Sequence, residues 1–235
     1  MQLDYSNGHV VITGGTGALG TAVVELLIDG GATVHIPAHR VPEPSAFPLV
    51  RHERVRIVAP VDLTGEDAVH SFYHSLPSLW ASVNAAGGFA AAPIGETSLD
   101  AFRQMIEINA VTSFLCCREA VQKIRTAAGS PGGRIVNVAA KPATVPTAGL
   151  CAYAASKAAV ANLTLTLSEE LAAERIWVNA VLPSIMDTPA NRKAMPNADY
   201  TKWPKLSEVA ATIAFLASPQ NIVTRGALVP VYGAS

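Results

Sequence analysis

The sequence has few charged residues and no long apolar run. Charged side chains make up 15% of the 235 residues and the net charge is −1, so nothing indicates a nucleic acid or an anionic membrane as a partner. No uninterrupted apolar run approaches the ~20 residues of a membrane span, and the first eight residues lack the basic-then-apolar order of a signal peptide. Hydrophobic residues make up 50% of the chain, which is typical of a globular protein with a large core. We expect a cytoplasmic protein with no membrane partner.

Disulfides and a metal centre also lack support in the sequence. The three cysteines are an odd number, and Cys116 and Cys117 are adjacent, so they do not make a disulfide framework and a reducing compartment is expected. His70 and His74 stand four residues apart on an expected helix, which is the spacing of a metal-binding pair, but no third ligand or carboxylate is marked nearby. We interpret both histidines as surface residues and expect no metal.

What the chain does have is a regular alternation of strand and helix patterns. The expected strands are 9–13, 33–36, 55–61, a strand starting at residue 82, 133–138, 176–182 and 227–231, and the main expected helices are 21–29, 99–126, 152–173 and 207–218. There is no internal repeat and no linker. This order predicts one α/β domain over residues 1–235, a Rossmann-type doubly wound parallel sheet in three α/β/α layers, with ligand at the carboxyl ends of the strands.

A glycine-rich turn follows the first expected strand and leads into the first helix. Strand, glycine turn and helix form the first half of a dinucleotide site, because glycines let the backbone approach a pyrophosphate and the helix N-terminus offers free N–H groups. A simple tight turn is the alternative interpretation. The residues expected to hold the cofactor here are Gly14, Thr16, Gly17, Ala18, Leu19 and Gly20.

The end of the second strand bears on the choice of cofactor. An acidic residue there would bind a ribose 2′-OH and favour NAD, whereas basic residues accommodate a 2′-phosphate. This chain has His39 and Arg40 with no acid in reach, and a guanidinium matches phosphate geometry. We therefore favour NADP(H) over NAD(H), with a solvated loop arginine as the alternative interpretation of Arg40.

Tyr153 and Lys157 stand four apart at the start of the expected helix 152–173, so their side chains share one face. An ammonium one turn away favours the phenolate and lowers the phenol pKa from about 10, which makes an acid/base usable near neutrality. Coincidental helical spacing is the alternative. Asn109 lies in the middle of the expected helix 99–126, where asparagine is unfavourable, so it is either a satisfied polar group or part of a proton relay.

Taken together, these motifs resemble the short-chain dehydrogenase/reductase family from end to end. The resemblance implies that Tyr153 is the general acid/base, that Lys157 lowers its pKa and holds the nicotinamide ribose, and that Asn109 maintains a water-linked proton path. The further cofactor contacts that the resemblance implies are Asp62 and Leu63 for the adenine, Asn84, Ala85, Ala86 and Gly87 of the central strand motif, and Pro183, Ile185 and Thr188 of the nicotinamide loop.

The chain departs from that family pattern in three places. Ala18 stands where the third glycine of the turn is usual, and Ser184 replaces the glycine that normally follows Pro183. The family serine expected about 13 positions before the tyrosine is absent, since Ala139 and Ala140 occupy that region. A hydroxyl there would stabilise charge on a carbonyl oxygen, and its loss should cost on the order of 3 kcal/mol of transition-state stabilisation. The expected substitute donors are Lys141, Thr144 and Thr147.

Within the family, the chain is most similar in motif detail to dihydropteridine reductases, which also lack this serine. The similar stretches are residues 14–20, 86–89, 140–143, 187–189, 191–193, 195–196 and 199–200. Those enzymes commonly carry an acid after the second strand, which this chain does not. An electron-poor pterin can accept hydride on its ring with a proton from Tyr153, and Phe89 is placed to stack on such a ring.

The resemblance leaves three functions open: a dihydropteridine-reductase-like enzyme, an NADPH-dependent ketone or quinone reductase with a substitute donor, and a cofactor-binding sensor without turnover. The residues expected to face a small-molecule substrate are Phe89, Lys141, Cys151, Met186 and Trp203. Residues 187–205 are expected to form a substrate lid, with a mobile loop as the alternative. The resemblance also implies a homodimer or homotetramer.

Overall fold

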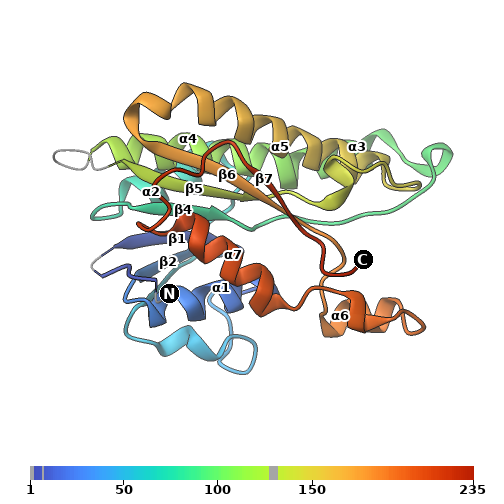
Figure 1. Cartoon of the computed structure of the whole chain (residues 1–235), viewed down its shortest axis with the longest axis horizontal. Coiled ribbons are helices and arrows are strands. Elements are labelled where there is room, and N and C mark those ends of the chain that lie inside the picture. Colours follow the sequence, from blue (N-terminus) through green and yellow to red (C-terminus); the bar gives the residue numbers. More distant parts are fainter. Residues whose placement is uncertain (1–2, 7, 127–131) are drawn as a thin grey trace.

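Seven parallel strands form one sheet in the computed structural model, which describes residues 3–6, 8–126 and 132–235. The strand order is β3-β2-β1-β4-β5-β6-β7, and helices cover both faces of the sheet (Figure 1). The strands are β1 (His9–Thr13), β2 (Thr33–Pro37), β3 (Val55–Val58), β4 (Ala81–Asn84), β5 (Gly133–Val138), β6 (Ile176–Pro183) and β7 (Leu228–Val231). The expected three-layer, doubly wound α/β fold of Rossmann type is confirmed.

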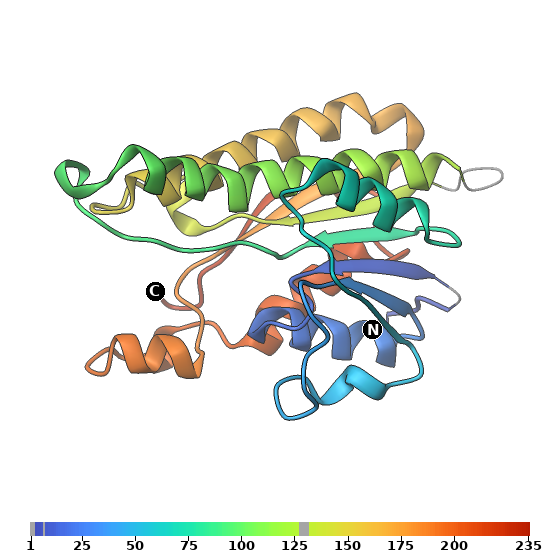
Figure 2. The ribbon, with the colours of Figure 1, turned by 180° about the vertical axis from the view of Figure 1, so that it is seen from behind.

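Two groups of helices enclose the sheet, as Figures 1 and 2 show from opposite sides. One face carries α1 (Ala18–Asp29) and α7 (Leu206–Ala217), and the other carries α2 (Glu66–His74), α4 (Thr112–Arg125) and α5 (Cys151–Glu170). Val10 and Ile12 of β1 pack in the core beneath α1 and α7, whereas Val11 packs beneath α2 and α4, since strand side chains alternate. Every residue of β4 and β5 is buried, because both faces of these central strands are covered.

Several element boundaries differ from the expected ones. α1 begins at Ala18, three residues early, because Gly17 of the turn is itself the residue that precedes the helix. β3 ends at Val58 and not at residue 61, since Pro60 has no N–H to donate to a strand ladder. α5 ends at Glu170, and the short 3₁₀ turn Ala172–Glu174 completes the expected helix.

The expected helix 99–126 contains an irregular turn that its sequence does not reveal. α3 (Leu99–Met105) runs into a π-helical turn (Ile106–Val111), which continues as α4. A π turn takes one more residue than an α turn and is frequent at functional sites. This one contains Asn109, which is fully buried. The interruption therefore coincides with a residue that the sequence singled out.

β4 and β5 carry a ladder of buried polar side chains that faces α2, α4 and α5. The hydroxyls of Tyr73 and Ser82 lie 2.8 Å apart, and Ser82 donates to Asn84 Oδ1 at 3.0 Å. Asn84 Nδ2 donates to Asn137 Oδ1 at 2.8 Å, and Asn137 Nδ2 donates to Thr164 at 2.9 Å. Asn84 and Asn137 are register partners, so a slip of one residue would turn one amide to the other face. The Asn84 side chain thus lies in the core, so a contact of Asn84 with a cofactor would have to be made by its backbone and stays a prediction.

A pair of histidines links β1 and β2 on the same face. His9 Nδ1 lies 2.9 Å from His35 Nε2, and His35 is buried beside Arg56 of β3. Burial, then the neighbouring His9 and Arg56, lowers the pKa of His35 to about 4. His35 is therefore neutral in the folded protein over a range in which a solvated histidine is protonated.

Mild acid should destabilise the protein through His35. An unfolded histidine titrates near about 6.5, so between about pH 6.5 and pH 4 the unfolded chain binds more protons and stability falls with falling pH. The shift corresponds to about 3 kcal/mol lost across this window. Urea unfolding at pH 7 and pH 4.5 should show a smaller loss for His35→Gln than for the native chain. Exposed His52→Gln is the control, and equal slopes for both variants would contradict the assignment.

The expectation that no carboxylate lies near His70 and His74 is wrong. A carboxylate does lie beside the pair, because Glu119 Oε2 is 2.9 Å from His70 Nδ1, and the rings of His70 and His74 stack. Over the described ranges, 3–6, 8–126 and 132–235, no three His, Cys, Asp or Glu side chains converge as metal ligands. In the same part of the chain, every helix is too short or too polar to serve as a membrane span.

Candidate active site

The sheet reverses its strand order between β1 and β4, and the residues of interest gather there. From β1 the chain builds outward through β2 and β3, whereas β4 starts the other half of the sheet. In open α/β sheets, ligands bind outside the carboxyl ends of the strands at such a switch point. The glycine turn follows β1 here, and the segment Ala85–Gly88 follows β4. The Gly14 position is so tight that an added Cβ would lie 2.9 Å from the Ala86 nitrogen.

The glycine turn has the geometry of a pyrophosphate cradle. Gly14 has φ of +68°, and a Cβ on Gly20 would lie 2.1 Å from the Gly14 carbonyl oxygen, so both positions require glycine. Gly17 precedes α1 without any side-chain cap, which leaves the first N–H groups of the helix available for an anion. Ala18 is exposed on the first turn, so its methyl group does not fill the cradle. The residues present fit a dinucleotide.

Not every turn residue faces the cradle. Leu19 is buried in the core cluster beneath α1 and α7, where it anchors the helix. Gly20 is buried against the backbone of Gly14 and keeps the turn closed. Leu19 and Gly20 therefore support the predicted cofactor site through packing, and the Leu19 side chain does not face it.

The ends of β2 and β3 bring the basic and acidic candidates together. His39 and Arg40 are exposed directly after β2, and Arg40 has no ion-pair partner among the described residues. Hydrogen bonds from Thr64, and then the nearby His39, lower the pKa of Asp62. Asp62 therefore lies close to His39, next to partly exposed Leu63, at the edge where the adenosine end of a dinucleotide is expected.

Tyr153 and Lys157 lie on the first two turns of α5, as expected. Lys157 is 6% exposed, its Nζ donates to the Val138 carbonyl at the end of β5 at 2.8 Å, and burial lowers its pKa to about 8. The expectation for Tyr153 itself is wrong in this structure, since burial raises the pKa of its phenol to about 12. The cause is the removal of the phenol from water, which disfavours its charged form. The phenol is thus a proton donor at neutral pH.

Asn109 ties the π turn to the loop after β4 and to α5. Its Oδ1 accepts from the Gly88 nitrogen at 3.0 Å, and its Nδ2 donates to the Gly88 carbonyl and to Ser156, both at 3.1 Å. A Cβ on Gly87 would lie 2.4 Å from Asn109 Oδ1 and 3.2 Å from Lys157 Nζ, so only glycine fits between them. All polar atoms of the Asn109 side chain have protein partners. Asn109 therefore holds backbone and helix together, and a role in a proton path stays a prediction.

Phe89 and Tyr153 form an aromatic corner at this edge. Their ring centroids lie 5.0 Å apart at an interplanar angle of 71°, and Phe89 is 66% exposed. Cys151, at the start of α5, is exposed with its sulfur 3.9 Å from the Thr97 hydroxyl. An exposed aromatic face next to the phenol is an arrangement that a flat ring could stack on.

The three side chains expected to replace the missing serine as a donor make hydrogen bonds to backbone oxygens and none to Tyr153. Ala139 and Ala140 are buried methyl groups. Thr144 and Thr147 are exposed and donate to carbonyls of their own loop, at 3.5 and 3.2 Å. Lys141 Nζ donates to the Ser235 carbonyl at 3.0 Å and lies over the Tyr232 ring, 4.9 Å from its centroid. No hydroxyl or ammonium in the described residues hydrogen-bonds the Tyr153 phenol.

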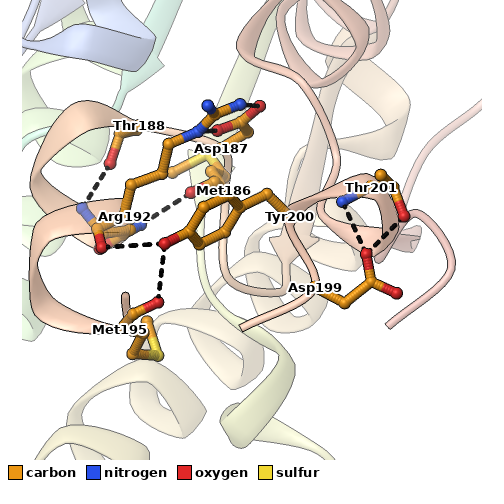
Figure 3. Close-up of polar contacts among 9 residues, drawn as sticks. Met186, Asp187, Thr188, Arg192, Met195, Asp199, Tyr200 and Thr201 are labelled. Atoms are coloured by element: carbon orange, nitrogen blue, oxygen red, sulfur yellow. Dashed lines mark hydrogen bonds and ion pairs between the residues drawn. The ribbon is translucent and has the colours of Figure 1, made fainter. Parts of the chain in front are cut away.

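The segment after β6 folds into α6 (Pro189–Ala194) and a 3₁₀ turn (Tyr200–Lys202), shown in Figure 3. The Tyr200 hydroxyl donates to the carbonyls of Arg192 and Met195 and so closes the segment on itself. Two ion-pair contacts at 2.6 and 2.8 Å join Arg192 to Asp187.

The residues of this segment that were expected to contact the cofactor or the substrate differ in exposure. Ile185 is exposed, whereas Thr188 is buried and caps α6 through its hydroxyl. Trp203 is only 8% exposed and packs against Tyr200, and Met186 packs against the core beneath α1 and α7. Trp203 is therefore mostly covered by its own segment and Met186 is partly buried, and a contact of either with a substrate stays a prediction.

Some residues at the site were missed from the sequence. Gly88 bonds Asn109 through its backbone, and the Val138 carbonyl holds Lys157, but a backbone contact leaves no signal in a sequence. Ser156 donates to the Tyr153 carbonyl at 2.7 Å and bonds Asn109. Its place between Tyr153 and Lys157 was the one signal that could have found it.

A parallel sheet with a glycine cradle, and with a partly buried tyrosine one helical turn from a buried lysine at its carboxyl edge, defines a nicotinamide-dependent oxidoreductase. Residues 8–199 match the family model described as short chain dehydrogenase, so the chain belongs to that family. It is 34% identical to the cis-4-hydroxycyclohexanecarboxylate dehydrogenase of Sinomonas cyclohexanicum, over 97% of this chain and 96% of the relative. It is 29% identical to 3beta-hydroxysteroid dehydrogenase 1 of Eggerthella lenta, over 99% and 95%.

Solved structures agree with the fold. The structure titled "ElxO with NADP Bound" has a TM-score of 0.86 at 23% identity and covers 97% of this chain and 98% of its own. A dehydrogenase/reductase from Sinorhizobium meliloti 1021 has a TM-score of 0.81 at 27% identity, over 99% and 96%. The expectation of an oxidoreductase of this family is confirmed.

Proposed function

We propose that this enzyme transfers hydride between NADP(H) and a small ring compound, with Tyr153 as the general acid/base. The observation that carries the proposal is the Tyr153 phenol beside the exposed Phe89 ring, one helical turn from a buried lysine. A bound nicotinamide would supply or accept the hydride. The glycine turn, His39, Arg40, Asp62 and the nicotinamide loop would hold the dinucleotide.

The chain's own residues account for the proton. Tyr153 is protonated at neutral pH and can give its proton to the substrate atom that gains negative charge. Lys157, with a pKa of about 8, is mostly protonated at pH 7, so its ammonium stabilises the phenolate left behind. Asn109 fixes Gly88 and Ser156, which sets the start of α5 and hence the direction of the phenol.

A pterin-like ring is the first candidate substrate. Ala139 and Ala140 leave no hydroxyl to stabilise an oxyanion, and a ring that accepts hydride on its own conjugated system has less need of one. Phe89 offers a flat apolar face for stacking. The segment 187–205 would cover the bound ring as a lid, with its internal bonds to Tyr200 keeping it folded as it moves.

An alicyclic ketone or alcohol is the second candidate, because two relatives are named as dehydrogenases of a hydroxycyclohexanecarboxylate and of a hydroxysteroid. Oxidation of NADPH should be followed spectrophotometrically with quinonoid dihydropterin and, separately, with 4-oxocyclohexanecarboxylate. Faster turnover of the first supports the pterin candidate and faster turnover of the second supports the ketone candidate. Tight NADPH binding with no turnover of these probes or of a diketone panel would favour a cofactor-binding sensor and overturn the proposal.

Arg40→Ala should weaken NADP+ binding selectively. The exposed guanidinium has no ion-pair partner in the described part of the chain, so a 2′-phosphate is free to bind it. We expect the Kd of NADP+ to rise about tenfold or more and that of NAD+ to change less than about twofold, as for loss of one charge-assisted contact. Calorimetric titration of both cofactors measures this, with Arg51→Ala as the control. An equal change for both cofactors would refute the clamp.

We also propose a homodimer or homotetramer in the cytoplasm. The α4–α5 surface exposes Phe114 (47%) and Leu165 (39%), which a second copy could cover. The three cysteines are free, in keeping with a reducing compartment. Light scattering on the native chain and on Phe114→Glu should show an assembly that the substitution weakens.

A further inference from the structure

Lys141 after β5 and Ser184 after β6 meet in one side-chain cluster with residues that follow β7. Lys141 Nζ donates to the Ser235 carbonyl at 3.0 Å and lies 4.9 Å from the centre of the Tyr232 ring. Ser184 donates to the Tyr232 carbonyl at 2.8 Å, and the hydroxyls of Ser184 and Ser235 lie 2.7 Å apart. The four residues thus form a closed ring of contacts.

The segment 232–235 also holds the base of the lid. The Ala234 nitrogen donates to the Lys202 carbonyl at 2.9 Å, and the backbone nitrogen of Asp187, at the other end of the lid, donates to the Pro204 carbonyl at 3.0 Å. Gly233 has φ of +64°, and a Cβ there would lie 2.7 Å from the Lys202 carbonyl oxygen. This close approach is possible only for glycine.

Lys141 is the cationic member of the cluster and forms no ion pair with an Asp or Glu side chain among the described residues. A carbonyl and an aromatic face are therefore the contacts that fix its ammonium, and a charge-assisted hydrogen bond with a cation–π contact is enough to do so. The turn that starts at Lys141 packs against α5, the helix of Tyr153.

We propose that Lys141, Ser184 and the segment 232–235 form a positioning cluster that sets the lid, residues 187–205, relative to α5. Lys141 acts through the segment 232–235 and is not the donor that replaces the missing serine. The cluster joins the loops after β5, β6 and β7, so the lid base cannot shift without breaking the bond at Lys141. The effect on substrate binding rests on the proposed function, whereas the mechanical link does not.

Hydrogen–deuterium exchange of the native chain and three variants tests the link without any substrate. Lys141→Met should speed exchange of the amides of 232–235 and of the lid about tenfold, the effect of losing one charge-assisted hydrogen bond on local opening. Lys141→Arg should restore slow exchange. Lys123→Met is the matched control, because Lys123 also donates to a backbone carbonyl, that of His74, but on the α2–α4 surface. Equal exchange in the Lys141→Met and Lys123→Met chains would overturn the proposal.

Steady-state kinetics separates a positioning role from a donor role, using whichever of quinonoid dihydropterin or 4-oxocyclohexanecarboxylate is turned over. Lys141→Met and Tyr232→Leu should each raise KM about tenfold with kcat changed less than about threefold, and the double variant should be no worse than either single one. A loss of kcat in Lys141→Met alone would overturn the proposal and make Lys141 the donor. If neither these probes nor the diketone panel is turned over, the proposed function fails, while the exchange experiment still decides the link.

Discussion

Replacement of Tyr153 by phenylalanine should lower kcat by about 10²- to 10⁴-fold, the usual contribution of a positioned general acid. The phenyl ring keeps the edge contact with Phe89 and the packing at the start of α5, so only the proton donor is removed. The Kd of NADP+ should stay within about twofold, since the loss is confined to the proton-transfer step. Stopped-flow or steady-state oxidation of NADPH, together with calorimetric titration of NADP+, measures both quantities.

Tyr5→Phe is the matched control for the loss of a phenol hydroxyl. Tyr5 is buried, lies far along the chain from the site and donates to the Ala214 carbonyl of α7. Its variant should lose stability and keep native kcat per folded molecule. Turnover by Tyr153→Phe at the native rate would show that the proton comes from another group, and the assignment of the general acid would then be wrong.

Replacement of Lys157 by methionine should separate activity from stability. Lys157 is 6% exposed, and the depression of its pKa to about 8 means that keeping it charged in the folded protein costs about 3 kcal/mol at pH 7. Methionine removes that cost but leaves the Val138 carbonyl without its donor, a penalty of about 1–3 kcal/mol. We expect stability within about 1 kcal/mol of native or higher, as for other buried charges replaced by apolar groups. We expect kcat to fall about 10²-fold, because the phenolate loses its stabilising charge.

The pH dependence of stability checks the same lysine. An unfolded lysine titrates near about 10.4, so between about pH 8 and pH 10 the unfolded chain binds more protons and native stability rises with pH. Lys157→Met should lack this rise. Urea unfolding of both chains at pH 7.5 and pH 9.5 tests it, and a rise of equal size in the variant would show that another group is responsible.

The strands, the glycine turn and the placement of Tyr153 and Lys157 could be predicted because they depend on local patterns. A β-branched run followed by glycines leaves few alternatives for the backbone, and a spacing of four on a helix fixes a shared face. The depth of burial at Tyr153 could not be predicted, since it comes from groups such as Phe89 that are distant in sequence. For that reason the sign of the Tyr153 pKa shift was wrong.

The directions of several side chains also could not be predicted from the sequence. Asn84 follows a pattern typical of a cofactor strand, yet its amide lies on the face that packs against the helices, where it bonds Asn137. Trp203 looked like a substrate contact because it lies in the lid, but it packs against Tyr200. Lys141 donates to Ser235, which is 94 residues away in the sequence, and no local sequence pattern predicts such a contact.

The π turn at Ile106–Val111 holds one residue more than a regular helical turn needs, and that surplus constrains what the chain can lose. Deleting a single residue there would let α3 and α4 join as an uninterrupted α-helix, in which the backbone hydrogen bonds are regular. The same deletion would swing the Asn109 amide about 100° around the axis, away from Gly88 and Ser156. The deletion would thus give a more regular helix but would remove the hydrogen bonds by which Asn109 holds Gly88 and Ser156 beside Tyr153. We therefore expect residues 106–111 to tolerate substitutions far better than the deletion of a residue.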